Sequence, residues 1–342
     1  MSNDAVPLRR YPPLSLTPII ADRLAELLAV WPRELTLENL ADTRATDEQL
    51  YPQTIDEHVG TRPLDFFESE IASADGAPIR LACYRPSASS VATPAFLYLH
   101  SGGLVTGTRF AEDLRLLDLA VDTGSSVVSV EYRLAPEHSF PAAIEDCYAA
   151  WNWLASGRSA LNVDPSRIVL VGESAGGGLA AALAILIRDR GGAQPAAQLL
   201  ATPMLDHRNN SASVHQLDGI GLWDKVSNQT GWSAYLGPSA GTDNVPGHGS
   251  PSSAEVLASL PPAFIDVGDA EIFRDEAVDY ARRLWLAGVS AELHVWTGGC
   301  HTFYALIPEL PLAQVVYASR LEWLLRTLYG TVREGQSKQH PQ

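Results

Sequence analysis

The stretch that decides the fold runs from Ile168 to Ile187 and reads IVLVGESAGGGLAAALAILI. Its first four residues predict a buried strand, whereas the Ala- and Leu-rich second half predicts a helix that is apolar all round. Between them lies the pattern G-x-S-x-G, in which a sharp turn exposes a serine hydroxyl at the start of a helix. Ser174 is therefore the candidate nucleophile, and the free N–H groups at this helix start favour developing negative charge.

A phosphate-binding turn is the competing interpretation of the same stretch, because glycine-rich turns between a strand and a helix also hold phosphates. The glycines at 172, 176, 177 and 178 do not follow the dinucleotide spacing G-x-G-x-x-G, and no P-loop lysine follows them. The spacing thus favours the serine nucleophile.

Short apolar runs alternate with helical patterns on both sides of this stretch. Strands are predicted at 79–84, 95–100, 127–131, 168–172, 197–201, 263–268 and 291–296. Helices are predicted at 110–122, 142–156, 275–287 and 313–328. Such alternation is typical of an α/β fold with a mostly parallel central sheet and helices on both faces.

Two regions interrupt the alternation. Residues 16–50 are predicted to be helical, with Thr17 as a cap and Pro18 at a first helical position. Residues 206–252 are rich in glycine, and we interpret them as an insertion that caps one end of the sheet, with Trp223 and Trp232 as candidate lining residues of the cap. The polar tail at 331–342 is expected to fray.

The composition argues against several classes of protein. Of the 342 residues 46% are hydrophobic, which is enough for a large core, and the net charge of −16 would repel nucleic acid and anionic membrane surfaces. The longest apolar run, 179–187, is too short to cross a bilayer. The chain start lacks a secretory pattern and the three cysteines show no paired spacing, so we expect a cytoplasmic protein without membrane insertion.

A glycine pair follows the strand predicted at 95–100 and precedes Ser174 in the chain. Acyl transfer needs backbone N–H donors aimed at an oxyanion, and glycines let the chain turn such donors inward. Gly102, Gly103 and Ala175 are therefore the candidate oxyanion-hole residues. We expect His100, directly before this loop, to shape it by hydrogen bonding.

His301 is the candidate general base, because it lies in the loop after the last predicted strand, from which it can reach a serine at the carboxyl edge of the sheet. We expect its neighbour Cys300 to be a packing residue rather than a thiol nucleophile or metal ligand. The acid should lie between serine and histidine in chain order. Asp269, Glu271 and Asp275 all follow the strand at 263–268, and these residues alone do not choose among them.

Together these motifs resemble the hormone-sensitive-lipase-like α/β-hydrolases, the bacterial family IV esterases. The likeness covers most of the chain and involves five segments: His100-Ser-Gly-Gly103, Tyr132-Arg-Leu-Ala-Pro-Glu-His138, Gly172-Glu-Ser-Ala-Gly176, Glu271-Ile-Phe-Arg-Asp-Glu276 and Cys300-His-Thr-Phe303. The fourth is similar to the family's Asp-Pro-Leu-Arg-Asp-Glu, and the family's acid then falls on Glu271. The resemblance implies a triad of Ser174, His301 and Glu271, with Asp275 as the alternative acid.

The resemblance also implies an activity and a domain division. The activity is hydrolysis of small-molecule, short-chain carboxylic esters without metal or cofactor; an amidase or lactonase on the same scaffold is the alternative, and a non-catalytic ligand binder is a more remote one. Related enzymes often dimerise through the edge of the last strand, so a homodimer is one expected state. The division is an N-terminal cap part at 1–55, core at 56–205, cap insertion at 206–252, core at 253–330 and a tail at 331–342.

Overall fold

An eight-stranded sheet forms the centre of the computed structural model, which describes residues 14–29, 31–50, 55–111, 115–157 and 161–330. The tail predicted at 331–342 lies outside the described residues. The strand order is β1-β2-β4-β3-β5-β6-β7-β8, with antiparallel pairing of β1 with β2 and of β2 with β4, and parallel pairing elsewhere. The strands are β1 (Leu64–Ala72), β2 (Pro78–Pro86), β3 (Thr93–Leu99), β4 (Ser126–Val130), β5 (Val163–Glu173), β6 (Ala197–Ala201), β7 (Ala263–Gly268) and β8 (Ala291–Trp296).

The mostly parallel sheet is confirmed, and the seven predicted strands correspond to β2 to β8. The edge strand β1 was not predicted. β1 pairs with β2 as a hairpin at the sheet edge, and its burial alternates along the strand because one face meets solvent. The run LDFFESEIA mixes acidic and apolar residues, so it lacks the continuous apolar signal of the buried strands.

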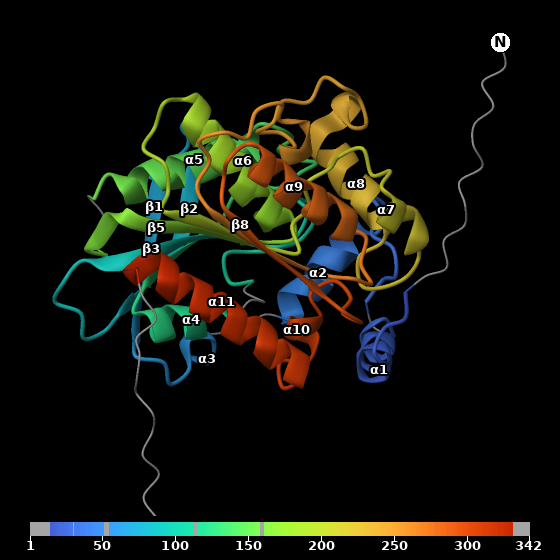
Figure 1. Ribbon diagram of the computed structural model, residues 1–342, viewed down its shortest axis with the longest axis horizontal. Helices are drawn as coiled ribbons and strands as arrows, with labels where there is room; N and C mark the ends of the chain where they lie inside the picture. The colour runs from blue at the N-terminus through green and yellow to red at the C-terminus, as the bar shows by residue number, and fades with distance from the viewer. Residues whose placement is uncertain (1–13, 30, 51–54, 112–114, 158–160, 331–342) are drawn as a thin grey trace, which may run out of the picture.

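Helices cover both faces of the sheet (Figure 1). One face carries α5 (Ala142–Ala155), α6 (Ala175–Asp189) and α9 (Arg274–Leu286), and the other carries α4 (Leu116–Thr123) and α11 (Pro311–Tyr329). Every residue of α6 from 175 to 187 is buried, as expected for a helix that is apolar all round. None of the helices in the described ranges combines the length and apolar character that a membrane crossing requires.

The helix predicted at 110–122 begins later than expected. α4 starts at Leu116, and Phe110 is in a turn, where its amide donates to the Thr108 hydroxyl at 3.1 Å. Residues 112–114 lie outside the described part of the chain. The apolar spacing typical of this helix extends back over the turn that contains Phe110, so the sequence pattern placed the start of the helix too early.

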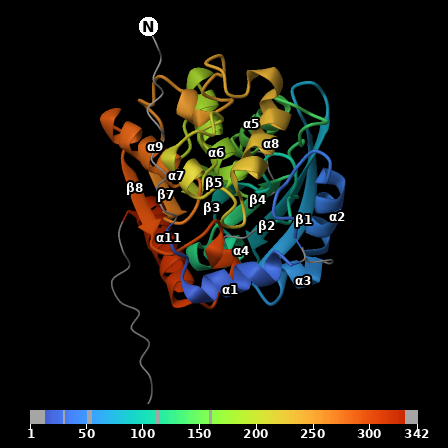
Figure 2. The ribbon, with the colours of Figure 1, turned by 90° about the vertical axis from the view of Figure 1, so that its right-hand side faces the viewer.

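The remaining helices gather mainly at one end of the molecule, which faces the viewer in Figure 2. They are α1 (Pro18–Leu27), α2 (Leu40–Leu50), α3 (Ile55–Val59), α7 (Ala212–Gln216), α8 (Lys225–Leu236) and α10 (Phe303–Leu306), with short 3₁₀ turns at Gly237–Ser239 and Pro251–Ser253. The N-terminal segment contacts the inserted one, since the Leu35 amide donates to the Ser227 hydroxyl at 2.9 Å. Thr17 is at the N-cap position of α1 as predicted, but its hydroxyl makes no capping hydrogen bond; instead its amide donates to the Gly298 carbonyl at 3.2 Å.

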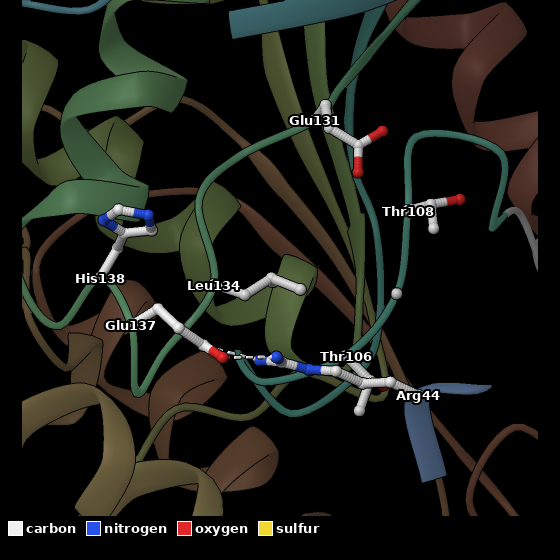
Figure 3. A pocket seen from close by; sticks show the side chains of 8 residues that line it. Arg44, Thr106, Thr108, Glu131, Leu134, Glu137 and His138 are labelled. Carbon is white, nitrogen blue, oxygen red and sulfur yellow. Dashed lines mark hydrogen bonds and ion pairs between the residues drawn. The ribbon is translucent and has the colours of Figure 1, made fainter. Parts of the chain in front are cut away.

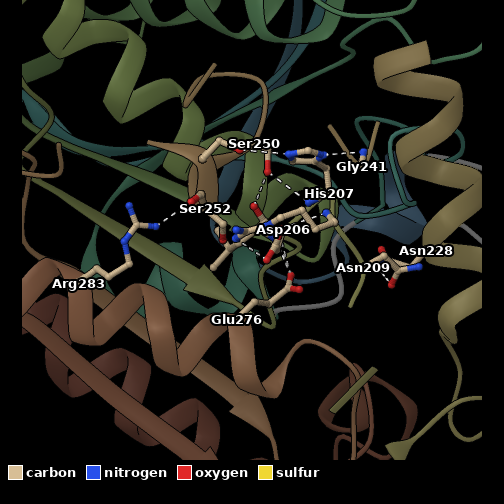
Figure 4. A network of polar contacts seen from close by, with 12 residues as sticks. Asp206, His207, Asn209, Asn228, Gly241, Ser250, Ser252, Glu276 and Arg283 are labelled. Atoms are coloured by element: carbon tan, nitrogen blue, oxygen red, sulfur yellow. Dashed lines mark hydrogen bonds and ion pairs between the residues drawn. The ribbon is translucent and has the colours of Figure 1, made fainter. Parts of the chain in front are cut away.

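A polar network, buried at Glu276 and partly buried at Arg283, holds both ends of the 206–252 segment against α9 (Figure 4). At one end, the Glu276 carboxyl accepts from the amides of Leu205 and Asp206 at 2.6 and 3.3 Å. At the other, Arg283 donates to the Ser252 carbonyl at 2.9 Å. Burial raises the pKa of Glu276 well above its usual range.

Candidate active site

Ser174 occupies a sharp turn between β5 and α6. Its backbone has φ 55° and ψ −119°, a conformation that costs free energy for any residue with a side chain. The turn is compact because Gly176 has no side chain: a Cβ there would collide with the Leu99 carbonyl. The strain and the close packing hold the Ser174 hydroxyl at the carboxyl edge of the sheet, as the motif predicts.

His301 and Glu271 reach this hydroxyl in a continuous chain of hydrogen bonds. The Ser174 Oγ to His301 Nε2 distance is 3.0 Å, and the His301 Nδ1 to Glu271 Oε2 distance is 2.5 Å. An ionised carboxylate only accepts hydrogen bonds, so Nδ1 of neutral His301 carries the proton and Nε2 is left as the acceptor for the serine. All three residues are at most 5% exposed, so little water competes for these hydrogen bonds.

The loop after β7 aims Glu271 at the histidine. Its second oxygen, Oε1, accepts from the Gly268 amide at 2.6 Å, so both carboxylate oxygens are engaged. The other two acid candidates lie elsewhere. Asp275 accepts from the Ser213 amide at 2.7 Å, and Asp269 accepts from the Gly298 amide at 2.7 Å. The structure therefore brings Glu271, and neither alternative, to His301.

Gly102 and Gly103 form a tight loop beside Ser174. Their φ angles of 113° and 60° suit glycine, and a Cβ on Gly103 would collide with the indole ring of Trp223. Among the described residues, no hydrogen bond uses the amides of Gly102, Gly103 or Ala175. These three N–H groups remain available to a ligand oxygen bound beside Ser174.

His100 lies behind this loop rather than in the pocket. Its buried ring stacks on Tyr132 at 4.0 Å between centroids, and Nδ1 lies 2.7 Å from the Ser101 carbonyl oxygen. The Tyr132 hydroxyl donates to the His100 carbonyl at 2.8 Å. Burial lowers the pKa of His100, so the ring stays neutral and supports the loop.

Cys300 is unsuited to nucleophilic chemistry. It is fully buried, and its Sγ donates to the His301 carbonyl at 3.7 Å. Burial, together with the nearby charge of Glu271, raises the pKa of its thiol to about 12. A thiol with this pKa stays protonated at neutral pH, in agreement with a packing role.

Ser174 and His301 open into a cavity of about 260 Å³. The Gly102–Gly103 loop lines this cavity together with partly exposed apolar side chains from α1, from the segment after it, from the 206–252 region and from α10, and Trp223 lies directly beside Gly103. The apolar lining residues are Leu27, Trp31, Leu222, Trp223, Ala305 and Leu306. Of the two tryptophans predicted to line the cap, Trp223 is in this set, whereas Trp232 is buried and does not line this cavity. The other five had only the apolar character of core residues, and no local pattern separates a pocket wall from a core position.

A second cavity, of about 360 Å³, lies on the other side of Thr106, which lines both (Figure 3). It contains none of the predicted site residues. Its charged groups are paired: Arg44 binds the Glu137 carboxylate at 2.7 Å and 2.9 Å, and this hydrogen bonding lowers the pKa of Glu137 to about 2. The larger cavity therefore contains none of the predicted triad residues, and the smaller one contains Ser174 and His301.

Known proteins of related sequence are named as esterases. The chain is 38% identical over 201 residues to esterase LipI of Mycobacterium tuberculosis, covering 59% of this chain and 62% of LipI. It is 34% identical over 236 residues to ethyl acetate hydrolase of Pseudomonas putida, covering 68% of this chain and 74% of that enzyme.

Solved structures of esterases have the same fold. A bacterial heroin esterase has a TM-score of 0.81 and 32% identity, with 90% of this chain and 97% of that chain covered. LipW from Mycobacterium marinum has a TM-score of 0.82 and 30% identity, with 95% and 98% covered. The family model described as alpha/beta hydrolase fold matches residues 96–305. The chain therefore belongs to the α/β-hydrolase family, in its hormone-sensitive-lipase-like group of bacterial esterases.

Proposed function

We propose that the chain hydrolyses small carboxylic esters through a triad of Ser174, His301 and Glu271. The observation that carries this proposal is the continuous hydrogen-bond chain from Ser174 Oγ through His301 to Glu271. The esterase names of its relatives support the reaction class.

In the first half of the reaction, Ser174 Oγ attacks the ester carbonyl carbon while His301 Nε2 takes the hydroxyl proton. The carbonyl oxygen becomes an oxyanion, to which the amides of Gly102, Gly103 and Ala175 donate. His301 then gives its proton to the leaving alcohol, and an acyl-enzyme remains. Glu271 holds the imidazole in the required tautomer and stabilises its positive charge throughout.

In the second half, water enters beside His301, which removes a proton as the water attacks the acyl carbon. The carboxylic acid leaves, and Ser174 regains its proton from His301. The chemistry needs only these side chains, three amides and water.

Short acyl and alcohol groups fit the cavity best, because its volume is about 260 Å³ and its far wall consists of bulky apolar side chains. The relative named ethyl acetate hydrolase supports a small ester as substrate. The natural ester is set by this wall rather than by the triad, since the triad chemistry is shared by esters, lactones and amides.

The test is Ser174→Ala on p-nitrophenyl acetate. We expect kcat to fall by about 10⁴-fold or more, because loss of a triad serine removes covalent catalysis. The matched control is Ser233→Ala, which changes an exposed serine on α8 that does not line the cavity. Full activity of folded Ser174→Ala would reject the proposal.

A homodimer is also part of the proposal. β8 forms an edge of the sheet, and Val295 on it and Trp285 on the adjoining α9 are 40% and 49% exposed. An unpaired strand edge bordered by apolar groups is suited to pairing with a second copy. Light scattering of the purified protein at several concentrations tests this state; a constant monomer mass would rule it out.

A further inference from the structure

A buried polar chain lies directly beneath the nucleophile and takes no part in the proposed reaction steps. It consists of Glu173, Tyr304, Arg320 and Asp266, each at most 4% exposed. The Tyr304 hydroxyl donates to Glu173 Oε2 at 2.9 Å. Arg320 binds Asp266 through two hydrogen bonds of 3.1 and 3.0 Å, and its guanidinium lies 4.1 Å above the Tyr304 ring.

The sheet register explains why these groups meet. Glu173 on β5 pairs with Ala201 on β6, which pairs with Asp266 on β7, so the three residues form one row across the sheet. Residues paired across neighbouring strands point to the same face, and here the middle one carries only a methyl group. Arg320, which α11 brings to this face, and Tyr304 of α10 meet the two carboxylates there.

This buried polar chain connects the turn that carries Ser174 with the loop that carries His301, two segments whose relative position the proposed reaction requires. Glu173 directly precedes Ser174, and Tyr304 comes three residues after His301. The hydrogen bond between them therefore spans from the nucleophile turn to the histidine loop. Because both groups are buried, water does not compete for this bond. The stacked guanidinium restrains the Tyr304 ring from its other side.

We propose that the Tyr304–Glu173 hydrogen bond holds the histidine loop at the distance from Ser174 that proton transfer requires, which makes Tyr304 and Glu173 positioning residues. This inference rests on the proposed triad. Neither side chain lines the catalytic cavity, so the pair acts through His301 and Ser174 and not on substrate. Burial, with the charge of Glu173, raises the pKa of the Tyr304 phenol, so it remains a donor at every working pH.

The first test is Tyr304→Phe, which removes the donor and keeps the ring under Arg320. Activity on p-nitrophenyl acetate is expressed per active site, counted by fluorophosphonate labelling, so unfolded protein does not contribute. We expect kcat to fall about tenfold with little change in KM, because small misplacements of reacting groups slow chemistry without weakening binding. The matched control is Tyr317→Phe, which removes a phenol donor to the Asp122 carboxylate at the exposed face of α11 and should keep kcat unchanged.

The second test separates the hydrogen bond from general stability. Glu173→Gln keeps an oxygen acceptor for Tyr304 and should retain most of kcat, whereas Glu173→Ala should lose about as much as Tyr304→Phe. The double variant Glu173→Ala/Tyr304→Phe should be no slower than either single variant, since both remove the same bond.

Two results would overturn the inference. One is a folded Tyr304→Phe with the kcat of Tyr317→Phe; the other is a Glu173→Gln as slow as Glu173→Ala. If Tyr304→Phe does not fold, the comparison of Glu173→Gln with Glu173→Ala alone decides whether the inference holds. Ser174→Ala is assayed in parallel: activity retained there rejects the triad itself, whereas an inactive Ser174→Ala beside a fully active Tyr304→Phe rejects only the positioning role.

Discussion

The two sides of the cavity at Ser174 and His301 are built in different ways. On the core side, Ser174, Glu271 and His301 each follow a sheet strand (β5, β7 and β8), are at most 5% exposed and have bonded partners. On the side that we interpret as a cap, called the cap side, Trp31 and Trp223 come from outside the sheet and are only partly buried. Trp223 makes one long hydrogen bond, from its Nε1 to Asn228 at 3.4 Å.

The difference separates chemistry from selectivity. Groups that exchange a proton must be aligned within a few tenths of an ångström, and rigid strand ends supply that alignment. A wall that only limits substrate size tolerates looser packing and changes of side chain. Changes on the core side should therefore alter kcat for every ester, whereas changes on the cap side should alter which ester is preferred.

After the loss of Ser174 itself, the largest effect is expected from Glu271→Gln on the core side. The amide cannot stabilise the imidazolium and favours the wrong histidine tautomer, so kcat should fall by about 10³-fold or more. Asp275→Asn is the matched control, because that carboxylate bonds to the Ser213 amide on α7 and does not reach His301. Steady-state kinetics on p-nitrophenyl acetate measure both, and a greater loss in Asp275→Asn would reassign the acid.

A smaller, selective effect is expected from Trp223→Ala on the cap side. Removing the indole enlarges the cavity beside Gly103, so kcat/KM for p-nitrophenyl hexanoate should rise relative to the acetate by about tenfold, the size of effect that apolar pocket contacts give.

The control for this change is Trp285→Ala, a half-exposed tryptophan on α9 that does not line the cavity. It should leave the ratio of the two esters unchanged. An equal loss of kcat/KM for both esters in Trp223→Ala would show that the indole supports the Gly102–Gly103 loop and does not set the substrate size.

The smallest effect is expected at the base of the inserted segment, from Glu276→Gln. Burial raises the folded-state pKa of Glu276, so its contribution to stability is full below the ordinary value of 4.5 and is lost as the pH rises toward the raised value. Glutamine keeps an acceptor for the Leu205 amide and does not titrate. The difference in thermal midpoint, Glu276→Gln minus wild type, should therefore increase by a few degrees between pH 5 and pH 8. A pH-independent difference would contradict the buried titration.

Sequence reasoning was most successful where function depends on neighbours in the chain. The turn around Ser174 and the Gly102–Gly103 loop have local patterns, because strained turns and close approaches need glycine at fixed spacing. The choice of Glu271 depends on how the loop after β7 folds, and residue chemistry alone left three acids open. Neither β1 nor the Tyr304–Glu173 bond has a local signal: the edge strand mixes polar and apolar residues, and the bond joins groups 131 positions apart.

The most direct measurement of the central claim is the mass of peptides after reaction with diethyl p-nitrophenyl phosphate. This reagent transfers its phosphoryl group to an activated nucleophile and releases p-nitrophenol. The account predicts one diethylphosphoryl adduct, on the peptide that carries Ser174, and its loss in both Ser174→Ala and His301→Ala. An adduct on any other residue, or an unmodified folded protein, would contradict it.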